Sequence, residues 1–302
     1  MSTPVPVRHD ALQPSGSEGA RPGLLLRLTA EAFGSFFLTV AGLGVPLFSI
    51  PQSSPLPAAL AAGLAVTAAM LAFGHASGGH FNPAITAGHL LAGRIRPGAA
   101  AAYAGTQLAG GLVGALALYG ILRTLPGIAD SRTAFDTVTA GFGEHSIIQA
   151  PLAAVLLLEM LGAAIIVAVF LATAGRDNAS RSAAAVAVGL SFAVLLQLGQ
   201  SVGNLPFNPA RAVASAVFSS GWALEQVWVF VAAPLVGAAV AGLVFRNGSP
   251  SAGAGESGVT ASAGTGSAPH ELEAGEDART GRDTAGEASE AQEFFEGKRG
   301  RG

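Results

Sequence analysis

The chain contains no cysteine, and this absence excludes disulfide bonds, thiolate metal sites and cysteine nucleophiles. It is also poor in charge, because only 12% of its 302 residues are Asp, Glu, Lys or Arg while 50% are hydrophobic. No charged residue occurs from Ala32 to Gly93, a stretch far longer than the about 20 apolar residues that one membrane-spanning helix needs. A soluble globular domain is therefore excluded, and the sequence indicates an integral membrane protein.

The sequence also lacks the residue combinations of common active sites. No nucleophile–base pair and no metal-ligating cluster stands out, so we expect no enzyme, no cofactor, no metal ion and no nucleic-acid partner. The formal net charge of −3 belongs to one end of the chain, because ten of the 19 acidic residues lie in residues 247–302. That segment is rich in Gly, Ser, Ala and Thr, which predicts a disordered cytoplasmic tail. Residues 1–23 are predicted to form a disordered N-terminal segment, without a signal peptide.

Six apolar segments between these ends are long enough to span a membrane as helices. They cover roughly residues 24–50, 56–77, 98–122, 150–173, 182–200 and 224–245. Two shorter apolar segments, residues 80–93 and 207–221, follow the second and fifth spanning segments and are too short to cross alone. The sequence thus predicts an all-α membrane protein with six transmembrane helices and two half-length segments.

Arginine positions predict the orientation of these segments. The connections after the second and fourth segments carry two arginines each, and one arginine flanks each end of the apolar region; these are Arg94, Arg96, Arg176, Arg181, Arg27 and Arg246. Arg123 and Arg132 lie on the opposite side, but in a long connection that also holds three acidic residues, where the rule is weak. Both termini are therefore predicted to be cytoplasmic.

The apolar region is an internal repeat. Glu31 is followed by Phe-Asn-Pro-Ala at Asn82, and Glu159 is followed by the same four residues at Asn208, at nearly the same spacing. We assign residues 24–122 to the first repeat and 150–246 to the second. Because each repeat crosses the membrane three times, the second is inverted relative to the first, an arrangement that places binding sites at the membrane midplane.

The Asn-Pro pairs predict the start of two short helices inside the membrane. Proline suits the first turn of a helix and asparagine is a good N-cap. In inverted repeats the two N-termini meet near the centre, where the helix dipoles and the amides of Asn82 and Asn208 favour the oxygen of a neutral molecule and oppose cations. A water molecule there would donate in both directions and would not pass a proton along a chain of hydrogen bonds.

The stretches SGGHFNPA, NPAR, AEAFGS and GWALEQVW resemble the aquaporin, or major intrinsic protein, family, over roughly residues 24–246 and most closely its bacterial water channels. The resemblance implies six helices plus two re-entrant half-helices, a pore in each subunit, a homotetramer in the lipid bilayer of a bacterial cell membrane, and permeation by water and small neutral solutes. It implies two pore motifs, a selectivity arginine, a pore-lining histidine and two structural buried acids; these are Asn82, Pro83, Ala84, Asn208, Pro209, Ala210, Arg211, His80, Glu31 and Glu159.

The predicted selectivity constriction departs from the pattern of water-selective members. Counting from the two asparagines places Ala62 where those members have an aromatic residue and Leu196 where they have a histidine. Leu205 and Arg211 complete the ring, which is expected to be wider and more apolar than a strict water filter. A shift of one residue in the fifth helix would place Gln197 in the pore instead of Leu196.

Three other functions remain open on the sequence alone. A glycerol or small-solute facilitator fits the missing aromatic residue, although Ala212 stands where glycerol channels tend to have Asp. A proton-coupled secondary transporter would use Glu31 and Glu159, and a membrane interaction protein would act through its tail. His89, two turns into the first half-helix, is a candidate pH sensor of the inner mouth.

Overall fold

The structure is a computed structural model that describes residues 22–49, 56–173 and 178–247. All of these residues fall in the first of the two units into which the chain divides, Met1–Ser251 and Ala252–Gly302. The predicted disordered tail, residues 247–302, lies outside the described residues except for Asn247, which is the last residue of a helix. The predicted N-terminal segment, residues 1–23, lies outside them except for Pro22 and Gly23.

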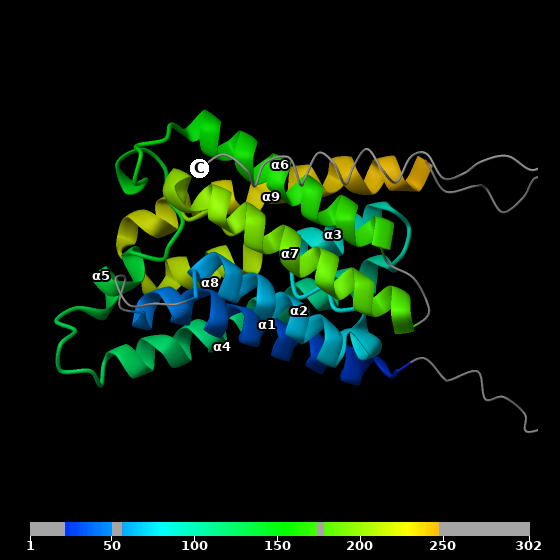
Figure 1. Cartoon of the computed structure of the whole chain (residues 1–302), viewed down its shortest axis with the longest axis horizontal. Coiled ribbons are helices and arrows are strands. Elements are labelled where there is room, and N and C mark those ends of the chain that lie inside the picture. The colour runs from blue at the N-terminus through cyan, green and yellow to red at the C-terminus, as the bar shows by residue number, and fades with distance from the viewer. Residues whose placement is uncertain (1–21, 50–55, 174–177, 248–302) are drawn as a thin grey trace, which may run out of the picture. The chain divides into compact units, whose positions relative to one another are not determined.

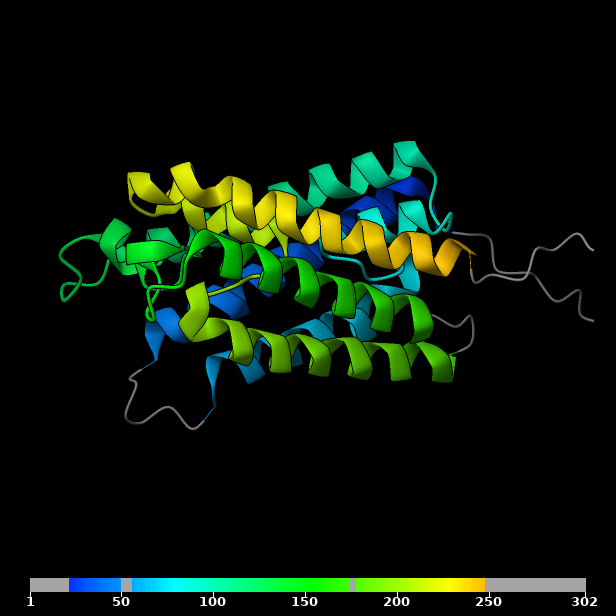
Figure 2. The same ribbon diagram turned by 90° about the horizontal axis from the view of Figure 1, so that it is seen from above.

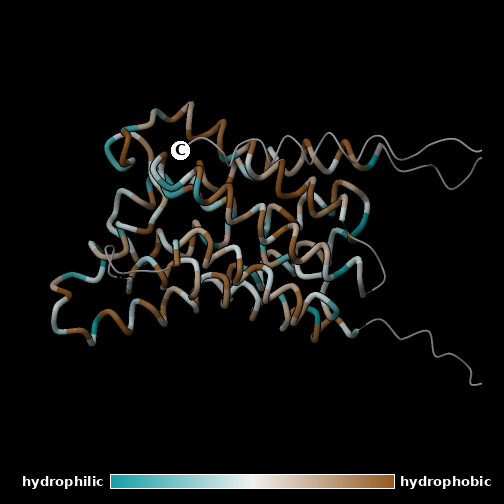
Figure 3. The backbone as a smooth tube through the Cα atoms, viewed as in Figure 1, coloured by the Kyte–Doolittle hydropathy of each residue, from teal (hydrophilic) through white to brown (hydrophobic). Residues whose placement is uncertain are grey.

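The described residues form helices and turns, without any strand. Six of these helices are long and apolar enough to cross a membrane. They are α1 (Leu24–Phe48), α2 (Ala58–Ser77), α4 (Pro97–Leu122), α6 (Leu152–Thr173), α7 (Asn178–Gly203) and α9 (Gly221–Asn247). Figure 3 shows hydrophobic residues along the lengths of these helices, with most hydrophilic residues near their ends.

One half-length helix completes each repeat: α3 (Pro83–Leu91) in the first and α8 (Pro209–Phe218) in the second. Figure 1 shows that α1 begins and α9 ends at the same end of the bundle, here called the terminal end. The opposite end, here called the loop end, carries the connection between α4 and α6. The predicted fold class, six spanning helices and two half-helices in an inverted repeat, is confirmed.

Local structure in the long connection was not predicted. A short helix, α5 (Ser131–Asp136), and a single 3₁₀ turn, η1 (Gly143–His145), lie between α4 and α6. Asp130 starts α5 by accepting hydrogen bonds from the Arg132 backbone N–H (3.0 Å) and the Thr133 hydroxyl (2.7 Å). A short polar segment without hydrophobic periodicity gives no strong helix signal, which is why sequence analysis missed it.

Pairs of long helices pack closely at equivalent glycines in the two repeats. A Cβ atom at Gly110 of α4 would lie 2.0 Å from the Ala32 carbonyl oxygen of α1, and one at Gly237 of α9 would lie 2.0 Å from the Met160 carbonyl oxygen of α6. Such contacts leave no space for any side chain, so these helices approach backbone to backbone. The internal symmetry thus extends from the sequence motifs to the helix contacts.

Candidate functional site

The N-termini of the half-helices α3 and α8 contact each other in the middle of the bundle. Asn82 caps α3 by accepting a hydrogen bond from the Ala84 backbone N–H (2.8 Å), and Asn208 caps α8 by accepting one from Ala210 (3.0 Å). Each amide also donates across the junction: Asn82 Nδ2 to the Phe207 carbonyl (2.9 Å) and Asn208 Nδ2 to the Phe81 carbonyl (3.1 Å). The two helix N-termini, with their positive dipole ends, are thereby joined at one place.

The residue before each Asn-Pro pair is held in an unusual conformation. Phe81 and Phe207 have φ angles of 49° and 48°, in the left-handed region that phenylalanine rarely adopts. Their rings are buried against α1 and α6, where a Cβ atom at Gly34 or Gly162 would lie only 2.1 or 2.3 Å from them. This packing holds the turns that lead into the half-helices, and it depends on those two glycines.

Glu31 lies behind the first half-helix and is fully used as a hydrogen-bond acceptor. Its Oε1 accepts from the His80 backbone N–H (3.0 Å), and its Oε2 accepts from the Phe81 backbone N–H (2.7 Å) and from Gln107 Nε2 (2.7 Å). Gln107 was not predicted from the sequence, although a glutamine in an apolar helix is a usable signal for a buried polar contact. Glu31 thus fastens the turn before α3 to α1 and α4.

Glu159 is the equivalent residue of the second repeat, but it has fewer partners. Its Oε1 accepts from the Phe207 backbone N–H (3.1 Å), and its Oε2 is buried without a hydrogen-bond partner in the described structure. The difference follows from two prolines. Pro206 stands where His80 supplies a backbone N–H in the first repeat, and Pro234 stands where Gln107 supplies its amide.

Two cavities lie in series between the loop end and Asn208. The outer cavity, of about 70 Å³, is lined toward the loop end by residues such as Thr137 and Gln200, and the central cavity, of about 20 Å³, reaches Asn208. Four residues line both cavities and therefore form the boundary between them; they are Gly42, Ala62, Leu196 and Arg211. Leu205 lines only the outer of the two cavities.

This boundary contains three of the four residues predicted for the constriction and adds Gly42 of α1. The structure places Leu196 toward the pore and Gln197 on an exposed face of α7, so the alternative register does not occur here. Gly42 was missed because a glycine within an apolar helix resembles any other helix-packing position. Its carbonyl accepts a hydrogen bond from Arg211 Nη2 (3.3 Å).

Arg211 lies in the first turn of α8, and only part of its guanidinium is hydrogen-bonded to the protein. Its Nε and Nη1 atoms are buried and have no hydrogen-bond partner in the described structure. Arg211 lines both the outer and the central cavity, so its guanidinium lies beside the boundary between them. The site thus combines a cationic guanidinium with the apolar side chains of Ala62 and Leu196.

A third cavity, the inner cavity, opens toward the terminal end and has a volume of about 250 Å³. His80 and His89 both line it, with their rings 4.2 Å apart between centroids. His80 Nδ1 is 3.1 Å from the Thr86 hydroxyl, and His89 Nδ1 is 2.9 Å from the Ile85 carbonyl oxygen. Because only an N–H can bond to that carbonyl, His89 carries its proton on Nδ1.

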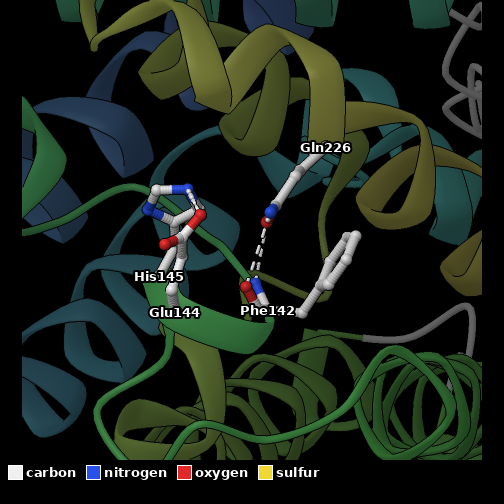
Figure 4. Close-up of polar contacts among 4 residues, drawn as sticks. All are labelled: Phe142, Glu144, His145 and Gln226. Atoms are coloured by element: carbon white, nitrogen blue, oxygen red, sulfur yellow. Dashed lines mark hydrogen bonds and ion pairs between the residues drawn. The ribbon is translucent and has the colours of Figure 1, made fainter.

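The long connection forms part of the outer cavity wall and is fastened to the helices around it. Phe142 exchanges two hydrogen bonds with Gln226 of α9: its N–H donates to Gln226 Oε1 (2.8 Å), and Gln226 Nε2 donates to its carbonyl (3.4 Å), as Figure 4 shows. His145 stacks on Trp222 at 3.9 Å between ring centroids, and Glu144 Oε1 lies 3.7 Å from His145 Nε2. The wall that carries Thr137 is therefore anchored to α9.

Among the described residues, no group of three or more His, Cys, Asp or Glu side chains could hold a metal ion. Arg211 lies beside the outer and central cavities, Asn208 beside the central one, and two histidines beside the inner one.

Comparisons with known proteins agree with this geometry. The sequence model of the Major intrinsic protein family matches residues 20–245. The chain is 35% identical over 232 residues to Aquaporin Z of Photorhabdus laumondii, covering 74% of this chain and 97% of that protein. It is 36% identical over 225 residues to Aquaporin Z of Bradyrhizobium diazoefficiens, covering 73% of this chain and 92% of that protein.

A solved structure shares the fold. The X-ray structure of the aquaglyceroporin from Plasmodium falciparum superposes with a TM-score of 0.60 at 20% identity, over 74% of this chain and 95% of the other. Family match, relatives and fold together establish that the chain belongs to the major intrinsic protein family.

Proposed function

We propose that this protein is a passive transmembrane channel that conducts water, together with small neutral solutes such as glycerol, and excludes protons and ions. The observation that carries the proposal is the boundary between the outer and central cavities, where the guanidinium of Arg211 lies beside the apolar side chains of Ala62 and Leu196. The curated relatives are named Aquaporin Z and the similar solved structure is an aquaglyceroporin, which supports a pore for water or small polyols.

Selection in this proposal has two stages. At the constriction, the Arg211 guanidinium repels cations and donates hydrogen bonds to a solute oxygen, while Gly42, Ala62 and Leu196 set the width and Leu205 lines the approach from the outer cavity. At the centre, Asn82 and Asn208 with the N-termini of α3 and α8 orient water and oppose positive charge. The motif residues Pro83, Ala84, Pro209 and Ala210 serve by starting the half-helices, and His80 lines the inner route.

The proposal also covers the setting of the channel. The arginines around the terminal end support cytoplasmic termini in the cell membrane of a bacterium, and membership in the family supports a homotetramer with one pore in each subunit. Neither an enzymatic activity nor a bound cofactor is part of it.

A proton-coupled transporter is not favoured. Glu31 and Glu159, the acids that it would require, accept hydrogen bonds from the backbone before α3 and α8, and neither lines the three cavities described above. Their proposed role is to hold the half-helices in place.

Stopped-flow light scattering on proteoliposomes tests the proposal, with water and glycerol measured side by side. Fast water flux with a low activation energy, independent of a pH gradient and without saturation, is expected. Glycerol flux well above that of empty liposomes would show that the ring without an aromatic residue admits small polyols. Water flux equal to that of empty liposomes would overturn the proposal.

Arg211→Val tests the role given to the arginine. Removing the charge and the donors should raise the leakage of protons or larger solutes, measured with a pH-sensitive dye inside the vesicles. An unchanged proton leak and an unchanged solute profile would contradict the role of Arg211 but leave the channel itself untouched.

A further inference from the structure

An apolar groove lies on the side of the half-helices that faces away from the pore. Its walls are α4 and α9, and its floor is formed by α3 and α8; in Figure 2 both wall helices lie along the upper edge of the view. The cavity has a volume of about 430 Å³, within the ~300–1,000 Å³ typical of pockets for small organic ligands. None of the cavities of the proposed permeation route includes it.

The lining of the groove offers contacts to hydrocarbon and almost none to a polar ligand. It consists of Ala, Leu, Val and Pro side chains apart from Thr86, whose hydroxyl already bonds with Gln107 Nε2 (3.0 Å). The hollow exists because α4 presents alanines there, Ala100, Ala101 and Ala104, rather than larger side chains. A ligand that fills the groove must therefore be apolar along this part of its length.

The length of the groove matches one leaflet of a bilayer. From Pro97 to Leu108 it follows α4 for about 16 Å, at the α-helical rise of ~1.5 Å per residue. Half of a typical hydrocarbon core is about 15 Å thick. The groove begins where α4 begins, at the terminal end, and reaches Pro83 and Pro209, where the two half-helices meet at the centre.

A basic group marks the end of the groove that would meet the lipid headgroups. Arg96 immediately precedes Pro97, is exposed, and makes no side-chain hydrogen bond or ion pair within the part of the chain that the structure describes. The nearby Arg94 is engaged, because its Nη1 donates to the Leu171 carbonyl (2.8 Å) and its guanidinium lies over Phe245. The free N–H groups of the first turn of α4 add positive potential beside Arg96.

We propose that this groove binds one acyl chain of an anionic phospholipid from the leaflet at the terminal end, with the lipid phosphate at Arg96 and the N-terminus of α4. The bound chain packs against the backs of Pro83 and Pro209 and so supports the half-helices from outside the pore. The site is distinct from the permeation route and from the lipid that surrounds any membrane protein, because it pairs an apolar slot of one-leaflet length with a cation at its headgroup end.

Native mass spectrometry of the full-length protein in detergent tests the proposal, with dioleoylphosphatidylglycerol and dioleoylphosphatidylcholine as probes. Wild type should bind one phosphatidylglycerol per chain in preference to phosphatidylcholine. Ala104→Phe fills the groove and should weaken the binding of the first phosphatidylglycerol severalfold. Ala101→Phe is a second variant that fills the groove, and it carries little risk to folding because Ala101 is exposed. Arg96→Gln should weaken phosphatidylglycerol binding about fivefold, the contribution of one basic residue at a membrane surface, with little change for phosphatidylcholine.

Matched controls lie on the same helix outside the groove. Ala117→Phe adds the same ring at an exposed position, and Arg123→Gln removes the same charge at the opposite end of α4; both should bind phosphatidylglycerol as wild type does. Added phosphatidylglycerol should raise the unfolding temperature of wild type and controls more than that of the filling variants. Phosphatidylglycerol binding as strong in Ala104→Phe and Ala101→Phe as in wild type would overturn the proposal. A change of oligomeric state in these variants without loss of lipid would also overturn it, because a second copy of the chain would then be the occupant of the groove.

Discussion

Single residues show how the two repeats differ within a common plan. Glu31 and Glu159 occupy equivalent places, yet the first accepts hydrogen bonds on both carboxylate oxygens and the second on one. Two prolines account for the difference, because Pro206 has no N–H and Pro234 has no side-chain donor. The turn before α3 is therefore held by a carboxylate that accepts hydrogen bonds on both oxygens, and the turn before α8 by a carboxylate that accepts on one oxygen only.

This asymmetry predicts unequal effects of the same substitution. In Glu31→Gln the side-chain N–H₂ group replaces one of two oxygens that both accept hydrogen bonds, so it faces an N–H donor in either orientation of the amide. The substitution should therefore lower the free energy of unfolding by about 1–3 kcal/mol, the cost of buried polar groups left unpaired. Glu159→Gln can turn its N–H₂ toward the free Oε2 position and should cost clearly less. Thermal unfolding in detergent, followed by fluorescence-detected size exclusion, compares the two variants. Equal losses would show that the hydrogen-bond count does not decide their contribution.

Gly42 leads to a prediction about the width of the pore. A Cβ atom there would lie 3.4 Å from Arg211 Nε and 3.8 Å from the Ala62 Cβ, so the larger side chain of Gly42→Val would project into the constriction. Water permeability in proteoliposomes should fall close to that of empty liposomes, while the amount of folded protein stays the same. Gly120→Val on α4 is the matched control, because a Cβ atom at Gly120 meets nothing within 4 Å. Wild-type permeability of Gly42→Val would remove Gly42 from the constriction.

At the scale of elements, the sequence predicted helices best where long apolar segments and Asn-Pro pairs mark their extent. The six spanning helices and the start of each half-helix followed from apolar length and from Asn-Pro, since both depend on local chemistry. α5 could not be predicted because its short polar sequence has no hydrophobic periodicity. The anchoring of the long connection to α9 could not be predicted because it arises from contacts such as Phe142–Gln226 between distant segments. The sequence could not decide whether Leu196 or Gln197 faces the pore, because both registers of the fifth spanning helix fit it. The packing of α7 in the structure places Leu196 there.

Asp136, the last residue of α5, ties the long connection to the end of α8. Its Oδ1 accepts hydrogen bonds from the Ser219 hydroxyl and the Ser220 backbone N–H (2.9 Å), and its Oδ2 accepts one from the Ser220 hydroxyl (2.6 Å). Partial burial opposes ionisation of this carboxyl, but the hydrogen bonds from Ser219 and Ser220 outweigh it and lower the pKa of Asp136 below its usual value. The ionised form is therefore the one that holds the two elements together.

The lowered pKa of Asp136 predicts a stability contribution that depends on pH. Because the folded-state pKa lies below the unfolded value of about 3.8, the contribution is complete above that pH and is lost as the pH falls through the folded pKa. Asp136→Asn should lower the free energy of unfolding by about 1 kcal/mol at pH 7, less than a fully buried charged group would give, because the carboxyl is partly exposed. The difference in unfolding temperature between wild type and Asp136→Asn should stay constant down to about pH 3.8 and shrink as the pH falls further. Glu225→Gln, an exposed acid on α9, serves as the control, and a difference that stays constant with pH would contradict the assignment.

At the scale of the whole molecule, the two repeats act together. The outer, central and inner cavities draw on both repeats, and the junction of Asn82 with Asn208 joins their half-helices. In the proposed homotetramer we therefore expect each chain to form its own pore. The apolar side chains exposed on the long helices, such as Leu64, Val194 and Val240, are available to lipid or to neighbouring subunits.

Separate pores predict how mixed oligomers conduct. If wild type and Gly42→Val are co-expressed with different tags and oligomers of each ratio are purified, water permeability per chain should fall in a straight line with the fraction of Gly42→Val. A straight line follows because a blocked constriction affects only the chain that contains it. A steeper fall would mean that a blocked subunit closes its neighbours, and the route would then have to include contacts between chains. Mixtures with Gly120→Val should stay level, which separates the effect of the pore from that of mixing itself.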